Sequence, residues 1–235
     1  MIWKFFSSLF VDLIDMIYPK LCLSCNETLA GSESVICTKC IYEIPKTNFH
    51  TCKYNSVFDL FYGKISIFSA TAFFYFQKGS VYQNLMHQLK YKGHKEIGIE
   101  LGKLFALDIQ HATDYNKIDY IIPIPLHPSR QRKRGYNQSE MIAIGMAEIL
   151  HAKVLNHAII RNKATQTQTK KSKTERMENV KSIFEIKDKI SFSGSHILLI
   201  DDVITTGSTL ISCAEEIHKN VSCKLSIAAL AIAKN

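Results

Sequence analysis

One short segment, His196–Leu210, limits the fold of this 235-residue chain more than any other. Four apolar residues, Ile197–Ile200, are followed at once by the adjacent carboxylates Asp201 and Asp202, and then by five small residues, Thr205–Thr209. Such a run predicts a buried central strand that ends in two acids and passes through a tight turn into a helix. Connections of this kind are typical of parallel sheets with helices on their faces.

The rest of the chain alternates in the same way between short apolar segments and amphipathic ones. Strands are predicted at Ile65–Phe76, Tyr120–Pro123, Ala158–Ile160, Ser182–Ile186 and Lys224–Ala233. Helices are predicted at Val81–Lys92, Glu96–Ile109, Gln138–Leu150 and Gly207–His218. Residues 161–181 are polar and basic without apolar periodicity, which predicts a long mobile loop. The whole pattern predicts an α/β protein with a mostly parallel sheet flanked by helices.

The turn after the two acids has the chemistry of a sugar-phosphate site. In open α/β sheets, ligands bind beyond the carboxyl ends of the strands. Hydroxyl-bearing residues at a helix N-terminus offer N–H groups, hydroxyls and the positive dipole end to a phosphate. Adjacent carboxylates accept hydrogen bonds from a vicinal diol or reach a nearby cation. The segment therefore predicts a ribose 5-phosphate site made of Asp201, Asp202, Thr205, Thr206, Gly207, Ser208 and Thr209. A helix that is merely capped after a core strand explains this composition less well.

The net charge of +8 is concentrated in two segments. A cluster without nearby acids carries +4, and residues 153–181 carry +6, so the other residues together carry −2. The first cluster consists of Arg130, Arg132, Lys133 and Arg134, in a predicted loop between a strand and the Asn137–Ser139 helix start. This arrangement favours a localised anionic ligand over a generally basic surface. A contact with the phosphate backbone of nucleic acid stays open as the alternative.

Four of the seven cysteines form two CxxC pairs separated by 11 residues, namely Cys22, Cys25, Cys37 and Cys40. A CxxC turn places two thiolates at two corners of a zinc tetrahedron, and four thiolates leave no open position for catalysis. We therefore predict a structural Zn²⁺ bound by these cysteines, against the alternative of two buried or redox-active pairs. An odd number of cysteines suits a reducing compartment, so a cytoplasmic location is predicted.

The chain is predicted to have three parts. Residues 1–20 read as an amphipathic helix whose polar face contains acids, which favours packing on the protein over binding to a membrane. Neither a secretory signal nor a membrane-spanning helix is predicted. Residues 21–60 form the four-cysteine zinc-ribbon module, and residues 61–235 form the α/β domain.

Several motifs together resemble a known family. HILLIDDVITTGSTL resembles the 5-phosphoribosyl-1-pyrophosphate (PRPP) motif of type I phosphoribosyltransferases. The chain also resembles the ComF family of competence protein F–like proteins, with their DNA-utilisation and GntX-like relatives. This resemblance rests on an ordered set of motifs, namely the four-cysteine module, LKYKG, PIPLHPSRQRKRGYNQSE, ERMENV and the PRPP-like motif. The likeness covers nearly the whole chain from about Tyr18. It implies a type I phosphoribosyltransferase fold behind an N-terminal zinc finger.

The resemblance also implies roles for the predicted site. Asp201 and Asp202 would hold the ribose 2′- and 3′-hydroxyls, and Thr205–Thr209 would wrap the 5-phosphate. The basic cluster would bind pyrophosphate, Mg²⁺ would bridge the ribose and the pyrophosphate, and a closing loop would bring Lys170, Lys171 and Arg176. Oxopurine salvage enzymes of this fold carry an aspartate at the position of Thr205, which disfavours an oxopurine acceptor. No catalytic residue is identified, and Lys90 and Tyr91 are candidates for an acceptor pocket.

The departure from the family pattern is at Cys52. Many relatives have a further CxxC there, but Cys52 has no second cysteine beside it, so it is predicted to be free or an alternate ligand.

The resemblance implies a PRPP-binding protein that acts in DNA uptake, natural transformation or DNA utilisation, with phosphoribosyl (pentosyl) transfer as the leading reaction class. Two alternatives are a single-stranded DNA-binding protein of the competence machinery and a regulator that senses PRPP without catalysis. The expected partners are PRPP or a related phosphorylated ribose, single-stranded DNA, and other competence or recombination proteins.

Overall fold

The computed structural model describes residues 18–77, 79–161, 183–187 and 193–233. Residues 1–17 of the N-terminal helix predicted at 1–20, and the three loop residues Lys170, Lys171 and Arg176, lie outside these ranges, whereas residues 18–20 are described and are not helical. Within the described part of the chain, no helix is both long enough and apolar enough to cross a membrane.

A five-stranded sheet forms the centre of the molecule, and every pair of neighbouring strands in it is parallel. Its order is β1-β7-β6-β2-β3. The strands are β1 (Ser69–Phe76), β7 (Lys224–Ala233), β6 (His196–Ile204), β2 (Tyr120–Pro123) and β3 (Lys153–Val154). The predicted mostly parallel sheet is therefore confirmed. Its central strands are apolar on both faces, as sheets covered by helices on both sides require.

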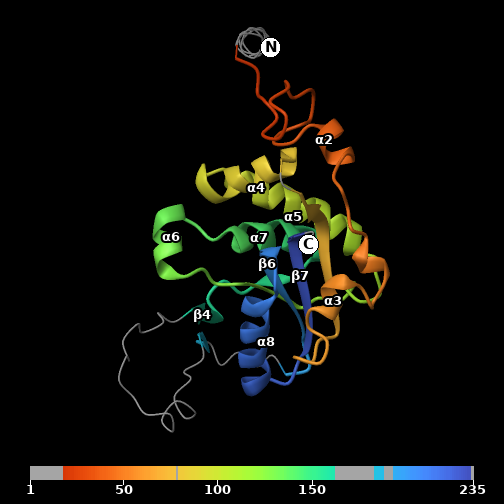
Figure 1. Cartoon of the computed structure of the whole chain (residues 1–235), viewed down its shortest axis with the longest axis vertical. Helices are drawn as coiled ribbons and strands as arrows, with labels where there is room; N and C mark the ends of the chain where they lie inside the picture. Colours follow the sequence, from red (N-terminus) through yellow and green to blue (C-terminus); the bar gives the residue numbers. More distant parts are fainter. Residues whose placement is uncertain (1–17, 78, 162–182, 188–192, 234–235) are drawn as a thin grey trace, which may run out of the picture.

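Helices cover both faces of the sheet (Figure 1). Alternate residues of β6 divide between two cores, with Leu198 and Ile200 in one and Ile197 and Leu199 in the other. The first core is closed by α4 (Val81–Tyr91), α5 (Lys95–Ile109) and α7 (Gln138–Leu150). The second is closed by α3 (Ser56–Asp59), α8 (Ser208–Asn220) and a hairpin of β4 (Ile159–Arg161) and β5 (Phe184–Ile186). The remaining short helices are α2 (Thr38–Tyr42), η1 (Phe49–Thr51) and α6 (Pro128–Arg134).

Two details of the sequence prediction are wrong, and one strand was missed. The basic cluster lies on a helix, α6, and not in a loop. β6 continues past the two acids to Ile204, because its pairing with β7 extends that far. The strands predicted at Ala158–Ile160 and Ser182–Ile186 are present as β4 and β5, which pair with each other, antiparallel, outside the main sheet. β3 was not predicted, because two residues give no periodic signal.

Glycines allow α5 and α7 to cross closely. A Cβ atom on Gly145 would lie 2.0 Å from the carbonyl oxygen of Ile99, and one on Gly102 would lie 2.4 Å from that of Ile142. Both neighbours are backbone atoms, which cannot move without displacing a helix. This crossing fixes the position of α7, whose first turn contributes to the site described below.

Replacing Gly145 with alanine is expected to lower the free energy of unfolding by about 1–3 kcal/mol, because the overpacked crossing must open. In an uncrowded helix the same change would raise stability by up to about 1 kcal/mol through helix propensity. Denaturant unfolding of Gly145→Ala shows whether the loss from overpacking or the gain in helix propensity is larger. An unchanged or raised midpoint would show that the crossing is looser than described.

The start of β6 contains a buried polar chain. His196 is 5% exposed, its Nδ1 lies 3.0 Å from the Lys117 carbonyl oxygen, and its Nε2 lies 2.8 Å from Ser226 Oγ. Ser226 Oγ in turn lies 2.8 Å from Ser69 Oγ. Burial, reinforced by the charge of Lys224, lowers the pKa of His196 to about 4. The imidazole is therefore neutral in the folded protein at neutral pH.

Stability is expected to fall as the pH drops from about 6.5 towards 4. Over that range the unfolded chain binds a proton at His196 that the folded chain does not accept. The loss is roughly 2 kcal/mol and is measured as the free energy of unfolding against pH. His196→Gln should flatten the profile. Equal slopes in the wild type and His196→Gln would exclude His196 as the cause.

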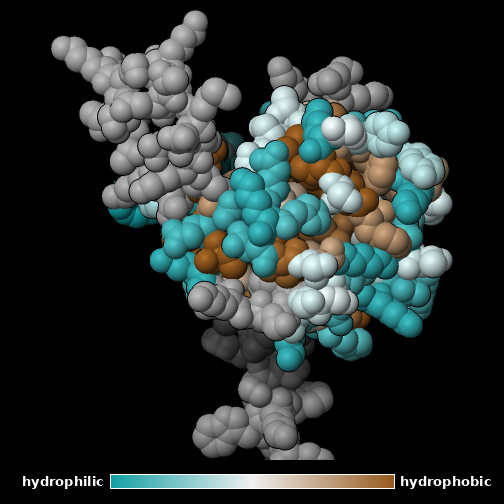
Figure 2. Space-filling model, turned by 90° about the horizontal axis from the view of Figure 1, so that it is seen from below, coloured by the Kyte–Doolittle hydropathy of each residue, from teal (hydrophilic) through white to brown (hydrophobic). Residues whose placement is uncertain are grey.

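Figure 2 shows the molecule from the end where α8 finishes, with hydrophobic residues interspersed among hydrophilic ones. A shallow hollow of about 520 Å³ lies at that end, lined by Ile65, Ser66, Glu215, His218 and Lys219. His218 Nε2 lies 2.7 Å from the Ser66 carbonyl oxygen there, so the C-terminal end of α8 is bonded to the segment that precedes β1.

Candidate functional site

The candidate site forms where two neighbouring strands end at different points. β2 pairs with β6 only as far as Pro123 opposite Ile200. β6 then continues along β7, so Asp201 and Asp202 lie just past the end of β2. The carboxyl edge of a parallel sheet is where open α/β folds bind ligands.

Asp201 lies in the interior of this site. Its Oδ1 accepts hydrogen bonds from Ser139 Oγ at 3.1 Å and from the backbone N–H of Asp202 at 2.8 Å. Desolvation of the carboxyl group, together with the negative charge of Asp202, raises the pKa of Asp201 well above the usual range of an aspartate. The free protein therefore holds Asp201 in an environment that disfavours its charged form, and a cation or a hydroxyl donor would relieve this.

The Ser139 hydroxyl is placed by the N-terminus of α7. Asn137 caps this helix, because its side-chain oxygen accepts from the Ser139 N–H at 3.1 Å. The Asn137 amide also donates to the Ile124 carbonyl at 2.9 Å, which ties the helix start to the end of β2. The sequence predicted a helix start at Asn137–Ser139, and the contact of Ser139 with Asp201 is a finding of the structure.

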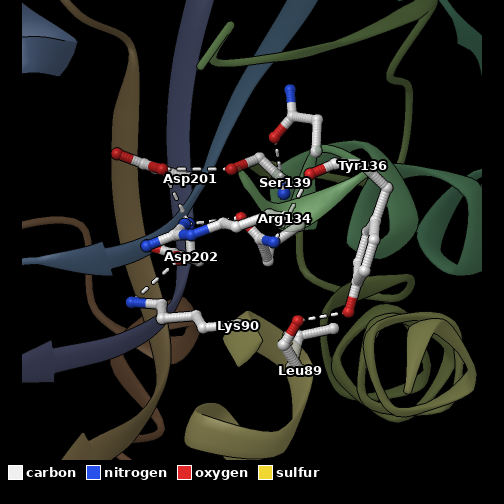
Figure 3. A network of polar contacts seen from close by, with 9 residues as sticks. Leu89, Lys90, Arg134, Tyr136, Ser139, Asp201 and Asp202 are labelled. Atoms are coloured by element: carbon white, nitrogen blue, oxygen red, sulfur yellow. Dashed lines mark hydrogen bonds and ion pairs between the residues drawn. The ribbon is translucent and has the colours of Figure 1, made fainter. Parts of the chain in front are cut away.

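Lys90 is the partner of the second carboxylate. Its Nζ lies 2.9 Å from Asp202 Oδ2, and the two side chains are 22% and 15% exposed (Figure 3). Lys90 comes from the last turn of α4 and offsets the repulsion between Asp201 and Asp202. The sequence indicated Lys90 only as an acceptor candidate, so the ion pair is a finding of the structure.

Of the four bases of α6, Arg134 is the one that the structure connects to this site. Its Nη1 donates to Gln138 Oε1 at 2.7 Å, and its guanidinium carbon lies 5.3 Å from the centre of the Tyr91 ring. Figure 3 shows Arg134 within the same group of polar side chains as Asp201 and Asp202. The three other bases, Arg130, Arg132 and Lys133, are exposed on α6.

The small-residue turn leads from β6 into α8 as predicted. Gly207 is the residue before the helix and has φ +72°, a conformation that favours glycine. Phe61 packs against it, so that a Cβ atom on Gly207 would lie 3.0 Å from the Phe61 ring. A small hollow of about 30 Å³ opens at this turn, lined by Asp201 and the residues from Val203 to Leu210. Of the predicted sugar-phosphate residues, all except Asp202 therefore line this hollow.

The four predicted metal ligands come together in the structure. The sulfur atoms of Cys22, Cys25, Cys37 and Cys40 all lie within 4.8 Å of one another, and those of Cys25 and Cys37 are 3.7 Å apart. In a tetrahedral site with Zn–S bonds of about 2.3 Å, neighbouring sulfurs lie about 3.8 Å apart. Cys52 is exposed, and among the described residues it is outside this group.

The surroundings of Cys22 suit a thiolate. Burial alone would raise its pKa, but backbone N–H groups around the sulfur lower the pKa to about 7. Two of these N–H groups, from Ser24 and Cys37, lie 3.4 and 3.2 Å from the sulfur. The cluster therefore could hold a metal ion, and its donor set is the one that structural zinc sites use.

The comparison with protein families agrees with the geometry of the sheet edge. Residues 138–235 match the model of the phosphoribosyl transferase domain, a range that contains α7, β6, the turn and α8. This part of the chain is therefore similar to a phosphoribosyl transferase domain. With the parallel sheet and the four-cysteine cluster, this confirms the predicted type I phosphoribosyltransferase fold behind an N-terminal cysteine module.

The chain is a homologue of the competence F and DNA utilization proteins, which confirms the resemblance to the ComF family. It is 36% identical over 139 residues to DNA utilization protein YhgH of Escherichia coli O157:H7, covering 58% of this chain and 60% of that protein. It is 33% identical over 139 residues to competence protein F of Haemophilus influenzae, covering 57% and 61%. It is 32% identical over 130 residues to competence protein ComFC of Bacillus subtilis, covering 53% and 48%.

The matched region thus spans about 60% of the length of the first two of these relatives. Among solved structures, glutamine PRPP amidotransferase from B. subtilis is 18% identical, with a TM-score of 0.40 over 60% of this chain and 30% of that one. This likeness is too slight to add to the family match.

Proposed function

We propose that the chain binds PRPP together with Mg²⁺ at the carboxyl edge of β6 and transfers its phosphoribosyl group. The observation that carries the proposal is the pair of half-buried carboxylates beside a hydroxyl-rich helix start, inside a segment that matches the phosphoribosyl transferase model. A ribose diol and its 5-phosphate would be bound side by side there.

Each part of the ligand has a complementary group in the site. Asp201 and Asp202 would accept hydrogen bonds from the ribose 2′- and 3′-hydroxyls, and carboxylate oxygens are also ligands that Mg²⁺ accepts. The N–H groups and hydroxyls of residues Thr205–Thr209 would bind the 5-phosphate. Arg134 would bind the pyrophosphate, with Arg130, Arg132 and Lys133 adding positive charge from the same helix. Lys170, Lys171 and Arg176 stay a proposal for the closing loop.

Phosphoribosyl transfer requires groups that stabilise the charges that develop on pyrophosphate and ribose, and these residues would provide them. Pyrophosphate leaves C1′ as an anion while the ribose gains positive character, so fixed cations at one end and carboxylates at the other lower the barrier. Mg²⁺ would neutralise charge on the departing pyrophosphate when it is bound. The protein's own part is to hold the ribose by its hydroxyls and its phosphate so that C1′ is presented to an acceptor.

The four-cysteine cluster is proposed to bind Zn²⁺ as a structural ion, with residues 21–60 as the module that it stabilises and 61–235 as the transferase domain. Four thiolates leave no open position for a substrate. The relatives' names favour DNA uptake or utilisation as the process that the activity serves. The proposed location is the cytoplasm, where free thiols persist.

The test is calorimetric titration of the full chain with PRPP and Mg²⁺, beside titrations with ribose 5-phosphate and with single-stranded DNA. Saturable binding of PRPP that requires Mg²⁺ supports the proposal. Binding of single-stranded DNA alone, with an affinity that falls steeply as salt increases, would replace it with the nucleic-acid alternative.

A further inference from the structure

Helix α4 is bonded to both halves of the four-cysteine cluster. The Tyr82 hydroxyl donates to the carbonyl oxygen of Cys40 at 2.8 Å, and the side-chain amide of Gln88 donates to the carbonyl oxygen of Leu23. Leu23 lies inside the first CxxC pair, and Cys40 ends the second. Tyr82 and Gln88 are 5% and 6% exposed, so water does not compete for these hydrogen bonds.

The last turn of the same helix reaches the carboxylate site. Lys90 follows Gln88 by two residues and pairs with Asp202 at 2.9 Å. The Leu89 carbonyl, one of those that a helix end leaves without an internal partner, accepts from the Tyr136 hydroxyl (Figure 3). The Leu89 side chain is fully buried in the core that also contains Cys22, Cys37 and Cys40. One helix therefore connects the two sites, through buried hydrogen bonds at the cysteine cluster and a half-buried ion pair at Asp202.

We propose that Tyr82 and Gln88 are positioning residues for the sugar-phosphate site: by bonding α4 to both CxxC pairs they hold Lys90 against Asp202, so that the folded cysteine cluster sets the affinity for PRPP. This inference rests on the proposed function of the carboxylates. Neither residue touches the ligand site, and both act through Lys90.

The physical reason lies in the flexibility of lysine and the charge of the ligand. A lysine side chain has four rotatable bonds and stays at one partner only if its backbone is fixed. Without Lys90, the adjacent Asp201 and Asp202 repel each other and also repel an anionic sugar phosphate. A small displacement of the end of α4 therefore weakens ligand binding without changing any group that the ligand contacts.

The test is a double-mutant cycle on the dissociation constant of PRPP in the presence of Mg²⁺. Tyr82→Phe with Gln88→Met removes both hydrogen bonds and keeps the ring and the side-chain length. We expect this pair to weaken binding roughly tenfold, and Lys90→Met to weaken it by a similar factor. All three substitutions together should cost no more than Lys90→Met alone. Full affinity in the Tyr82→Phe, Gln88→Met protein, or losses that multiply to about a hundredfold, would overturn the proposal.

A control separates this effect from a general loss of stability. Ser69 is 1% exposed, and its Oγ lies 2.8 Å from Ser226 Oγ, at the edge of the sheet opposite to the site. Ser69→Ala also removes a buried hydrogen bond and should leave the affinity unchanged. Weakening by Ser69→Ala equal to that by Tyr82→Phe with Gln88→Met would reduce the effect to stability and contradict the coupling.

A second readout is independent of PRPP. Amide hydrogen exchange at Leu89–Tyr91 should become at least tenfold faster in the Tyr82→Phe, Gln88→Met protein, and likewise after a chelator removes metal from the wild-type cluster. Unchanged exchange in both proteins would overturn the coupling even if PRPP binds. If the wild-type chain binds no PRPP, the proposed function fails while this measurement still decides the coupling.

Discussion

Replacement of Asp201 and Asp202 together by asparagine is expected to weaken binding of PRPP with Mg²⁺ by at least a hundredfold. The two carboxylates would each lose a charge-assisted hydrogen bond to a ribose hydroxyl, worth about 1.5–3 kcal/mol apiece. Their combined charge, which would attract Mg²⁺, would be lost as well. The measurement is calorimetric titration of the variant beside the wild type.

The fold should survive these changes, which makes the loss of binding specific to the site. In Asp201→Asn the side-chain oxygen still accepts from Ser139 and from the Asp202 N–H. Since the folded environment raises the pKa of Asp201, ionisation at neutral and higher pH opposes folding. Asp201→Asn alone should therefore be more stable than the wild type at pH 8, with a gain that shrinks towards pH 5, where the wild-type carboxyl is protonated.

Asp108→Asn is the matched control. Asp108 is paired with Lys46 at 2.8 Å, and it lines a different hollow, with His50 and His111. This variant loses a carboxylate of similar chemistry outside the site and should keep full affinity for PRPP. Equal weakening by Asp108→Asn would mean that net charge, and not the sugar-phosphate site, governs binding.

Replacement of Cys37 by serine is expected to abolish metal binding. The wild type should contain one zinc ion per chain, whereas Cys37→Ser should retain almost none after dialysis, because a tetrathiolate site loses one of its four bonds. Structural zinc contributes about 10–16 kcal/mol of binding energy in small zinc modules. Its loss should therefore unfold the region around the cluster and lower the midpoint of thermal unfolding by many degrees.

Cys52→Ser is the control for this prediction. Cys52 is exposed, and its thiol lies 3.2 Å from the Tyr54 carbonyl oxygen, outside the four-cysteine group. We expect the Cys52→Ser variant to keep the metal and the stability of the wild type. Zinc retained by Cys37→Ser, or lost from Cys52→Ser, would show that the ligand set is assigned wrongly. Elemental analysis of the purified proteins measures both.

The parts of the fold that the sequence predicted are those with strong local patterns. Tyr120–Pro123, Gln138–Leu150 and Lys224–Ala233 match observed elements at both ends, because apolar runs and helical periodicity reflect burial directly. The small-residue turn at Gly207 and the cysteine cluster were also predicted, because φ above zero and CxxC spacing each restrict the residue types that fit.

α6 was missed although its ends carry signals. The segment lacks an apolar stripe, so it shows no helical periodicity and was predicted to be a loop. Yet Pro128 is its first residue, the His127 side chain accepts from the Ser129 N–H, and Gly135 ends it at φ +78°. Proline at a helix start and glycine after its end mark a short helix even where nothing is buried. These boundary residues could have identified it.

The contacts that complete the site could not be predicted, because they join distant parts of the chain. Ser139 and Asp201 are 62 positions apart, and Lys90 reaches Asp202 from a different helix on the same face of the sheet. No local pattern encodes such pairs. They follow from the strand order and from the close crossing of α5 and α7, which only the assembled sheet determines.

Titration of the wild-type chain and the Asp201→Asn, Asp202→Asn variant with PRPP, each with and without Mg²⁺, is the most direct test of the sugar-phosphate site. We expect saturable binding by the wild type that requires Mg²⁺, and none by the variant at the same concentrations. Equal binding by both proteins would place the ligand elsewhere, and absence of binding by the folded wild type would contradict a sugar-phosphate site at the end of β6.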